Sequence, residues 1–128
     1  MRKISFLPLP NKTKFKMKEP WFVYAPKSMT VYDLEKKLRQ AANIYLKDVM
    51  NDTNYKIDQC RLWVTSDSKW SDLDQLDQKY RYVSSMRVKL IPVSVTESQK
   101  KLRIDDLNFV DEDVFIMETK KEGAYVFK

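Results

Sequence analysis

The segment from 31 to 45 constrains the fold of this chain most, because its apolar residues recur at the spacing of an α-helix. Thr30 stands directly before the segment, where its hydroxyl can accept a hydrogen bond from a free backbone N–H, and Asp33 lies in the first turn. Glu35 and Arg39 form an i,i+4 pair on the other side, which predicts the solvent face. The predicted buried face consists of Val31, Leu34, Leu38, Ala41 and Tyr45.

Segments with the character of β-strands flank this helix on both sides. They span residues 4–7, 12–18, 21–24, 61–64, 86–90 and 114–118. Apolar or alternating residues fill each segment, and proline, asparagine or charged residues bound most of them. One helix among several strands predicts an α+β fold in which a mixed sheet packs on one main helix. A length of 128 residues suits one domain spanning 1–128.

Composition excludes several kinds of site. The chain has no histidine, one cysteine (Cys60) and one glycine (Gly123), so it cannot build a Cys–His nucleophile pair, a Cys/His zinc cage or a glycine-rich phosphate loop. We therefore expect no catalytic residue, no cofactor and no metal. Cys60 begins an apolar run and is predicted to be a buried structural thiol. No leader, disulfide framework or long apolar run is visible, which predicts a cytoplasmic or nuclear protein without membrane contact.

The net charge of +6 is concentrated at the amino-terminal end. Residues 1–18 hold six of the 24 basic residues and no acid, which leaves eighteen residues of each sign in the remainder. Between 12 and 18, lysines alternate with other residues, so a strand there would carry them all on one basic face: Lys12, Lys14, Lys16 and Lys18. This basic face indicates protection of a sheet edge. Its alternative is capture of an acidic protein, an anionic lipid or nucleic acid phosphate.

Short motifs in a fixed order resemble a known family. They are Phe6-Leu7-Pro8, Thr30-Val31-Tyr32-Asp33-Leu34, Arg61-Leu62-Trp63, Trp70 with Leu73 and Leu76, and Val114-Phe115-Ile116-Met117-Glu118 followed by Gly123-Ala124-Tyr125. In this order they are similar to the ubiquitin-like domains embedded in ubiquitin-specific proteases. The resemblance implies a ubiquitin-like β-grasp and a parent enzyme that removes ubiquitin from substrates with a thiol-dependent site. None of that site lies in this chain.

Two departures from the ubiquitin pattern are visible. The chain ends without the di-glycine tail of conjugated ubiquitin-like proteins, since Gly123 stands alone. The segment from about 77 to 100 has no counterpart in a minimal ubiquitin-like domain, so the resemblance implies an insertion between the third strand and the final strand. We expect the strand-like middle of this insertion to extend the sheet.

Three large apolar residues form the predicted partner-binding surface: Trp63, Phe115 and Met117. The resemblance assigns them to the free face of the sheet, as in ubiquitin's own partner-binding patch. Strand alternation would then turn Leu62, Val64, Val114 and Ile116 inward. Exposed apolar clusters often mark partner sites. The alternative is that the insertion covers the three side chains, and we favour this alternative slightly.

The sequence thus predicts a non-catalytic, monomeric module that regulates a deubiquitinating enzyme through protein contacts. Its partner would be another domain of the parent protease, an adaptor or a substrate. Two alternatives stay open. A Ras-association-type domain would pair its second strand with a GTPase. A basic nucleic-acid-binding domain would use the amino-terminal charge, although binding to nucleic acid is disfavoured because no aromatic residues alternate with the lysines on the same face.

Overall fold

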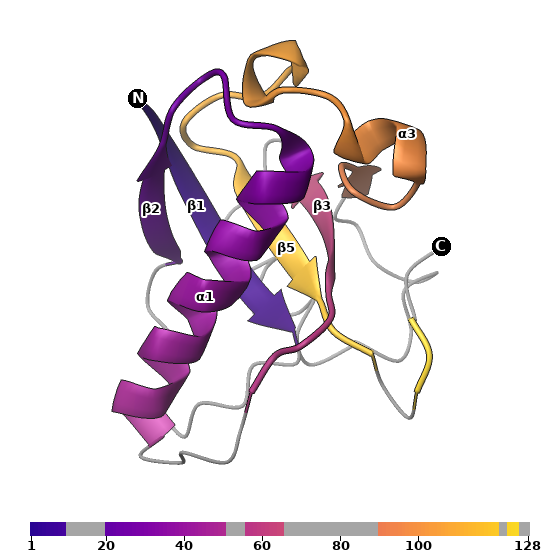
Figure 1. Ribbon diagram of the computed structural model, residues 1–128. Helices are drawn as coiled ribbons and strands as arrows, with labels where there is room; N and C mark the ends of the chain where they lie inside the picture. The colour runs from indigo at the N-terminus through magenta and orange to yellow at the C-terminus, as the bar shows by residue number, and fades with distance from the viewer. Residues whose placement is uncertain (10–19, 51–55, 66–89, 121–122, 126–128) are drawn as a thin grey trace.

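The computed structural model describes residues 1–9, 20–50, 56–65, 90–120 and 123–125 (Figure 1). The described elements are β1 (Arg2–Leu9), β2 (Trp21–Ala25), α1 (Val31–Met50), β3 (Arg61–Thr65), β4 (Leu90–Pro92), α3 (Glu97–Lys100), η2 (Ile104–Asp106) and β5 (Val114–Glu118). Four of the predicted strands and the predicted helix are confirmed, with ends that differ by a few residues. The predicted strand at 12–18 lies outside the described residues.

The strands form one five-stranded mixed sheet in the order β2-β1-β5-β3-β4. The central strands β1 and β5 run parallel, with Phe6 opposite Phe115, and the other neighbouring pairs are antiparallel. Helix α1 crosses one face of this sheet (Figure 1). The predicted α+β class, with a mixed sheet and one main helix, is confirmed, and the arrangement is compatible with a β-grasp.

Helix α1 begins as the sequence predicts and ends later. The backbone N–H of Asp33 donates to Oγ1 of Thr30 at 3.2 Å, which confirms the N-cap. Leu34 and Leu38 are fully buried, as expected for the core face. Tyr45 lies at the margin instead, with its ring stacked on Trp21 at a centroid distance of 5.0 Å. The helix continues beyond the predicted end at 45 because Leu46 adds another buried turn.

The prediction that Glu35 lies on the solvent face is wrong, because Glu35 is only 7% exposed. Glu35 follows the buried Leu34 at the border of the apolar stripe. Arg39 does not pair with it. The Arg39 guanidinium donates to the backbone carbonyl of Asp58 at 2.7 Å, in the segment that leads into β3.

The core lies between α1 and the sheet. Alternate residues of the three central strands face the helix, in agreement with the two-residue period of a strand. On the sheet side these are Ile4, Phe6, Leu62, Val64, Phe115 and Met117. Ile104 and Phe109, from the segment between α3 and β5, close the core, and the Phe109 and Phe115 rings meet edge to face at 5.0 Å.

The opposite face of the sheet is also buried over its central strands. Leu7, Leu9, Trp63, Val114 and Ile116 point to that side and are at most 5% exposed. All five residues of β5 are therefore buried. A central strand that is covered on both faces reads as a continuous apolar run without alternation, which is the pattern of 114–118.

The carboxyl-terminal part of the predicted insertion, residues 90–100, belongs to the described structure. Strand β4 pairs with β3, with Ile91 opposite Val64, and extends the sheet at that edge. Helix α3 follows, with a capping box between Thr96 and Gln99. The remainder of the insertion, 77–89, lies outside the described residues.

The chain after α3 is tied to the start of α1. Val31 N–H donates to the carbonyl of Leu102 at 2.7 Å, and Ile104 N–H donates to that of Met29 at 2.8 Å. These bonds satisfy backbone groups that a helix terminus otherwise leaves without partners. They place α3 beside the first turn of α1 (Figure 1).

Candidate functional site

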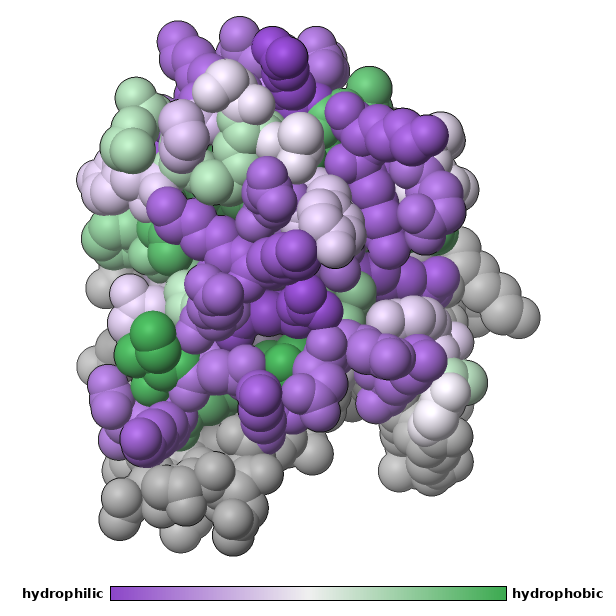
Figure 2. Space-filling view, viewed as in Figure 1, coloured by the Kyte–Doolittle hydropathy of each residue, from purple (hydrophilic) through white to green (hydrophobic). Residues whose placement is uncertain are grey.

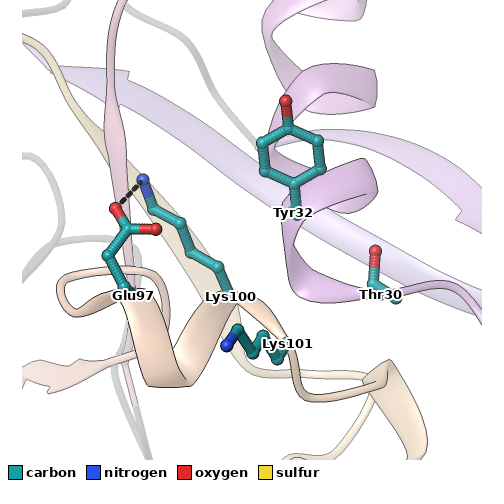
Figure 3. Close-up of a pocket in the computed structure, with 5 residues that line it drawn as sticks. All are labelled: Thr30, Tyr32, Glu97, Lys100 and Lys101. Atoms are coloured by element: carbon teal, nitrogen blue, oxygen red, sulfur yellow. Dashed lines mark ion pairs between the residues drawn. The ribbon is translucent and has the colours of Figure 1, made fainter.

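A pocket of about 430 Å³ opens between the first turn of α1 and helix α3. We call it the α1–α3 pocket. Its lining residues are Thr30, Tyr32, Glu97, Lys100 and Lys101 (Figure 3). The capping box fixes α3, the Thr30 cap fixes α1, and the Val31–Leu102 hydrogen bond holds the two elements together. The pocket is therefore built on structured elements.

Positive charge dominates the rim of the α1–α3 pocket. Lys100 Nζ lies 3.5 Å from a carboxylate oxygen of Glu97, and Lys101 also lines the pocket (Figure 3). Tyr32 is 50% exposed, and Lys36 Nζ lies 4.2 Å from the centroid of its ring. Lys100 and Lys101 thus line the pocket and Lys36 lies over the Tyr32 ring, whereas Glu97 supplies one carboxylate. Such a rim favours a ligand with negative charge.

Hydrophilic side chains cover most of the molecular face that α1 presents, and apolar residues are scattered singly among them (Figure 2). Tyr32 and Ile44 are both largely exposed on this helix, at 50% and 62%. Single exposed apolar residues are ordinary on a protein surface. What distinguishes Tyr32 is its position in the lining of a pocket that Lys100 and Lys101 also line.

Behind the pocket, Cys60 is buried and its thiol is deactivated. Burial, with a smaller contribution from the nearby Glu35 carboxylate, raises the pKa of Cys60 to about 12, against opposing effects of Arg39 and Lys100. The thiolate is the reactive form of cysteine, so this thiol is inert at neutral pH. The structure confirms the prediction that the Cys60 thiol is buried. Oε2 of Glu35 has no hydrogen-bond partner within the described structure.

A second cluster of polar groups lies on the other face of the sheet. Glu118 is fully buried and accepts hydrogen bonds from Nε of Arg61 at 2.6 Å and from Nε1 of Trp63 at 3.0 Å. The Arg61 guanidinium also stacks over the Tyr125 ring, 4.5 Å from its centroid. Burial raises the pKa of the Tyr125 hydroxyl. This cluster joins β3, β5 and the segment after β5, and its role in the fold is structural.

The structure separates the three residues of the predicted partner-binding surface. Trp63 lies opposite Ile116, whereas Phe115 lies opposite Val64 and Met117 opposite Leu62. Residues directly opposite each other share a face, so Phe115 and Met117 point into the core and Trp63 points away from it. Exposure is 5% for Trp63 and 0% for both others. The prediction of one shared outward face is wrong. All three side chains are buried, but Phe115 and Met117 are buried in the core between the sheet and α1, not beneath the insertion as the favoured alternative expected.

The basic face of Lys12, Lys14, Lys16 and Lys18 lies outside the described residues. Within them, two aromatic residues that the sequence analysis did not single out are exposed on β2. Phe22 and Tyr24 are 45% and 54% exposed, with rings edge to face at 5.8 Å. The alternation of Trp21 and Val23, which pack on the core, with these two residues was the signal that could have revealed them.

No protein-family model, no curated protein and no solved structure matches this chain. Among the residues that the structure describes, no group of three or more acidic, cysteine or histidine side chains could hold a metal ion. In the same part of the chain, no helix combines the length and the apolar character that crossing a membrane requires.

Proposed function

We propose that this chain is a ubiquitin-like β-grasp module that binds a protein partner and performs no chemistry itself. The observation that carries the proposal is the sheet order β2-β1-β5-β3-β4, with a parallel central pair β1–β5 and one helix across one face. This order places the first and last strands side by side and returns the chain through α1, as in a β-grasp. A sheet wrapped on one helix offers surfaces for binding rather than a deep catalytic cleft.

The narrower part of the proposal is a regulatory module of a deubiquitinating enzyme. It rests on the resemblance of the ordered motifs to ubiquitin-like domains of ubiquitin-specific proteases. The absence of histidine from the sequence and the pKa of about 12 at Cys60 support a non-catalytic role for this segment. The thiol-dependent site would then belong to other parts of the parent protein.

The α1–α3 pocket replaces the buried trio as the proposed docking surface. Tyr32 offers an amphipathic ring of the type enriched at interface hot spots. Lys36, Lys100 and Lys101 outnumber Glu97, so the pocket suits an acidic segment of a partner. Because the lysines lie at a solvated rim, we expect them to accelerate association and to make it salt-dependent.

Charge reversal at the pocket tests this function. The variant Lys100→Glu/Lys101→Glu is compared with the control Lys47→Glu/Lys56→Glu, which reverses two exposed lysines elsewhere. Binding to a fixed panel is measured by biolayer interferometry: ubiquitin, a ubiquitin-specific protease catalytic domain, a GTP-loaded GTPase and a single-stranded oligonucleotide. We expect a protein of the ubiquitin system to bind and the pocket variant to weaken that binding at least tenfold, with the control within twofold.

Three results would contradict the proposal. Binding to the oligonucleotide alone would favour the nucleic-acid alternative, and selective binding to the GTPase would favour a Ras-association-type domain. Equal losses in the pocket variant and the control would show that net charge, not this pocket, determines binding. Far-UV circular dichroism of each variant verifies that the fold is retained.

A further inference from the structure

Strand β2 forms one edge of the sheet and carries no charged residue. Its sequence is Trp21-Phe22-Val23-Tyr24-Ala25, and β1 is its only neighbour in the strand order. Among the described residues, no backbone hydrogen bond joins these five residues to any segment other than β1. Edge strands usually carry charges, prolines or bulges that prevent pairing with another chain. The lysines expected from the sequence to protect an edge, at 12–18, lie outside the described residues.

The opposite edge of the sheet is protected in the ordinary way. In the described part of the chain, strand β4 has three residues and ends at Pro92, which has no N–H to donate. Over the same residues, the β2 edge is longer and richer in aromatic residues than the β4 edge, and it contains no proline. The two edges therefore differ in how readily the strand of another chain can pair with them.

The sequence around β2 is symmetric about Val23. Pro20 and Pro26 stand three residues away on either side, and Phe22 and Tyr24 stand one residue away. An antiparallel pair of two such strands, centred on Val23, places Phe22 of one copy opposite Tyr24 of the other.

We propose that two copies of this chain associate through antiparallel pairing of their β2 strands about Val23. The pairing gains about four to six backbone hydrogen bonds, depending on which residues form the hydrogen-bonded pairs. It also creates two Phe22–Tyr24 cross-strand contacts on a face where both side chains are exposed in one copy. The contact is isologous and uses both β2 edges, so it closes at a dimer.

Prolines restrict this dimer to a five-residue ladder. A contact of this size lies at the small end of protein interfaces, and such interfaces are weak. We therefore expect reversible, concentration-dependent association, and the monomer expected from the sequence at low concentration. The proposal does not depend on the α1–α3 pocket, which lies on other elements.

Variants that place either positive or negative charges at positions 22 and 24 test the register of the proposed β2–β2 pair. Phe22→Lys/Tyr24→Lys and Phe22→Glu/Tyr24→Glu each place like charges opposite one another in a homodimer, whereas an equimolar mixture places opposite charges together. Sedimentation velocity measures the mass from about ten micromolar to one millimolar, the range of weak interfaces. We expect the wild type to move from 15.3 kDa towards twice that mass, each variant alone to stay at 15.3 kDa, and the mixture to regain association.

Ile44→Lys is the matched control, because Ile44 is 62% exposed on α1 and should leave the wild-type association unchanged. A second test uses oxidation. The two-fold axis brings Val23 opposite its own copy within disulfide reach, so Val23→Cys should cross-link, whereas Phe22→Cys and Tyr24→Cys should not. A wild type that stays monomeric at one millimolar, a lysine variant that associates like the wild type, or equal cross-linking at all three positions would overturn the proposal.

Discussion

Replacing Glu118 tests the clearest buried interaction of this protein. Its carboxylate is fully buried and holds Arg61 at 2.6 Å and the indole N–H of Trp63 at 3.0 Å. Glu118→Ala leaves the Arg61 charge, on a side chain only 18% exposed, without this partner. It also removes the acceptor that Glu118 offers to the Trp63 indole N–H. Both consequences arise on the sheet face opposite α1.

The expected cost follows from these two losses. Removing one partner of a buried ion pair costs about 3 to 5 kcal/mol, and losing one hydrogen bond costs about 1 kcal/mol. The two effects overlap, so we expect Glu118→Ala to lower the free energy of unfolding by about 4 kcal/mol. Glu118→Gln keeps an acceptor for Trp63 and should lose about half as much. Because the free energy of unfolding of a domain is only about 5 to 15 kcal/mol, the alanine variant should be only marginally stable.

Urea unfolding followed by far-UV circular dichroism measures these differences. A double-mutant cycle of Glu118→Met, Arg61→Leu and the double variant Glu118→Met/Arg61→Leu isolates the ion pair, since the double variant removes both charges together. Apolar replacement of a whole buried pair is often close to neutral, so the double variant should be more stable than Glu118→Ala. A loss below about 1 kcal/mol in Glu118→Ala, or purely additive effects in the cycle, would refute this account of the cluster.

Two further predictions concern the core and the thiol. Leu38→Ala should cost about 2 to 5 kcal/mol in urea unfolding, because Leu38 is fully buried between α1 and the sheet, and a near-neutral result would contradict the assigned helix face. The Cys60 thiol should react with Ellman's reagent at pH 8 only after unfolding; prompt reaction of the native protein would contradict its burial. Because its pKa rises from 9.0 unfolded to about 12 folded, stability should fall as pH rises from 9 towards 12, by at most about 4 kcal/mol, and Cys60→Ala should remove that part of the slope.

The helix and four strands were predictable because their signals are local. Thr30 caps α1 at the predicted residue, and the range 114–118 coincides with β5. Helix ends were less accurate, since α1 gains a further turn through the tertiary burial of Leu46. Local periodicity reports backbone geometry, whereas the point at which a helix stops depends on what its last turn packs against.

The candidate site was much less predictable. The sequence analysis selected Trp63, Phe115 and Met117, and the structure buries all three. The α1–α3 pocket joins Tyr32 to Lys100, residues far apart in the sequence that only the hydrogen bonds between 29–31 and 102–104 bring together. No local pattern carries that information, because each lysine alone reads as an ordinary solvated charge.

What the sequence determined by itself is the set of elements and the exclusion of histidine, zinc-cage and glycine-loop chemistry. Tertiary structure decided which faces those elements bury. Every residue of β5 is apolar or buried, so its sequence has no alternation of polar and apolar residues that would show which side faces the helix. A shift of one residue in the pairing would exchange its two faces. The ladder with β3 fixes that choice by setting Phe115 opposite Val64. The same long-range pairing carries Glu118 to Arg61 and Trp63, and it leaves β2 at the edge.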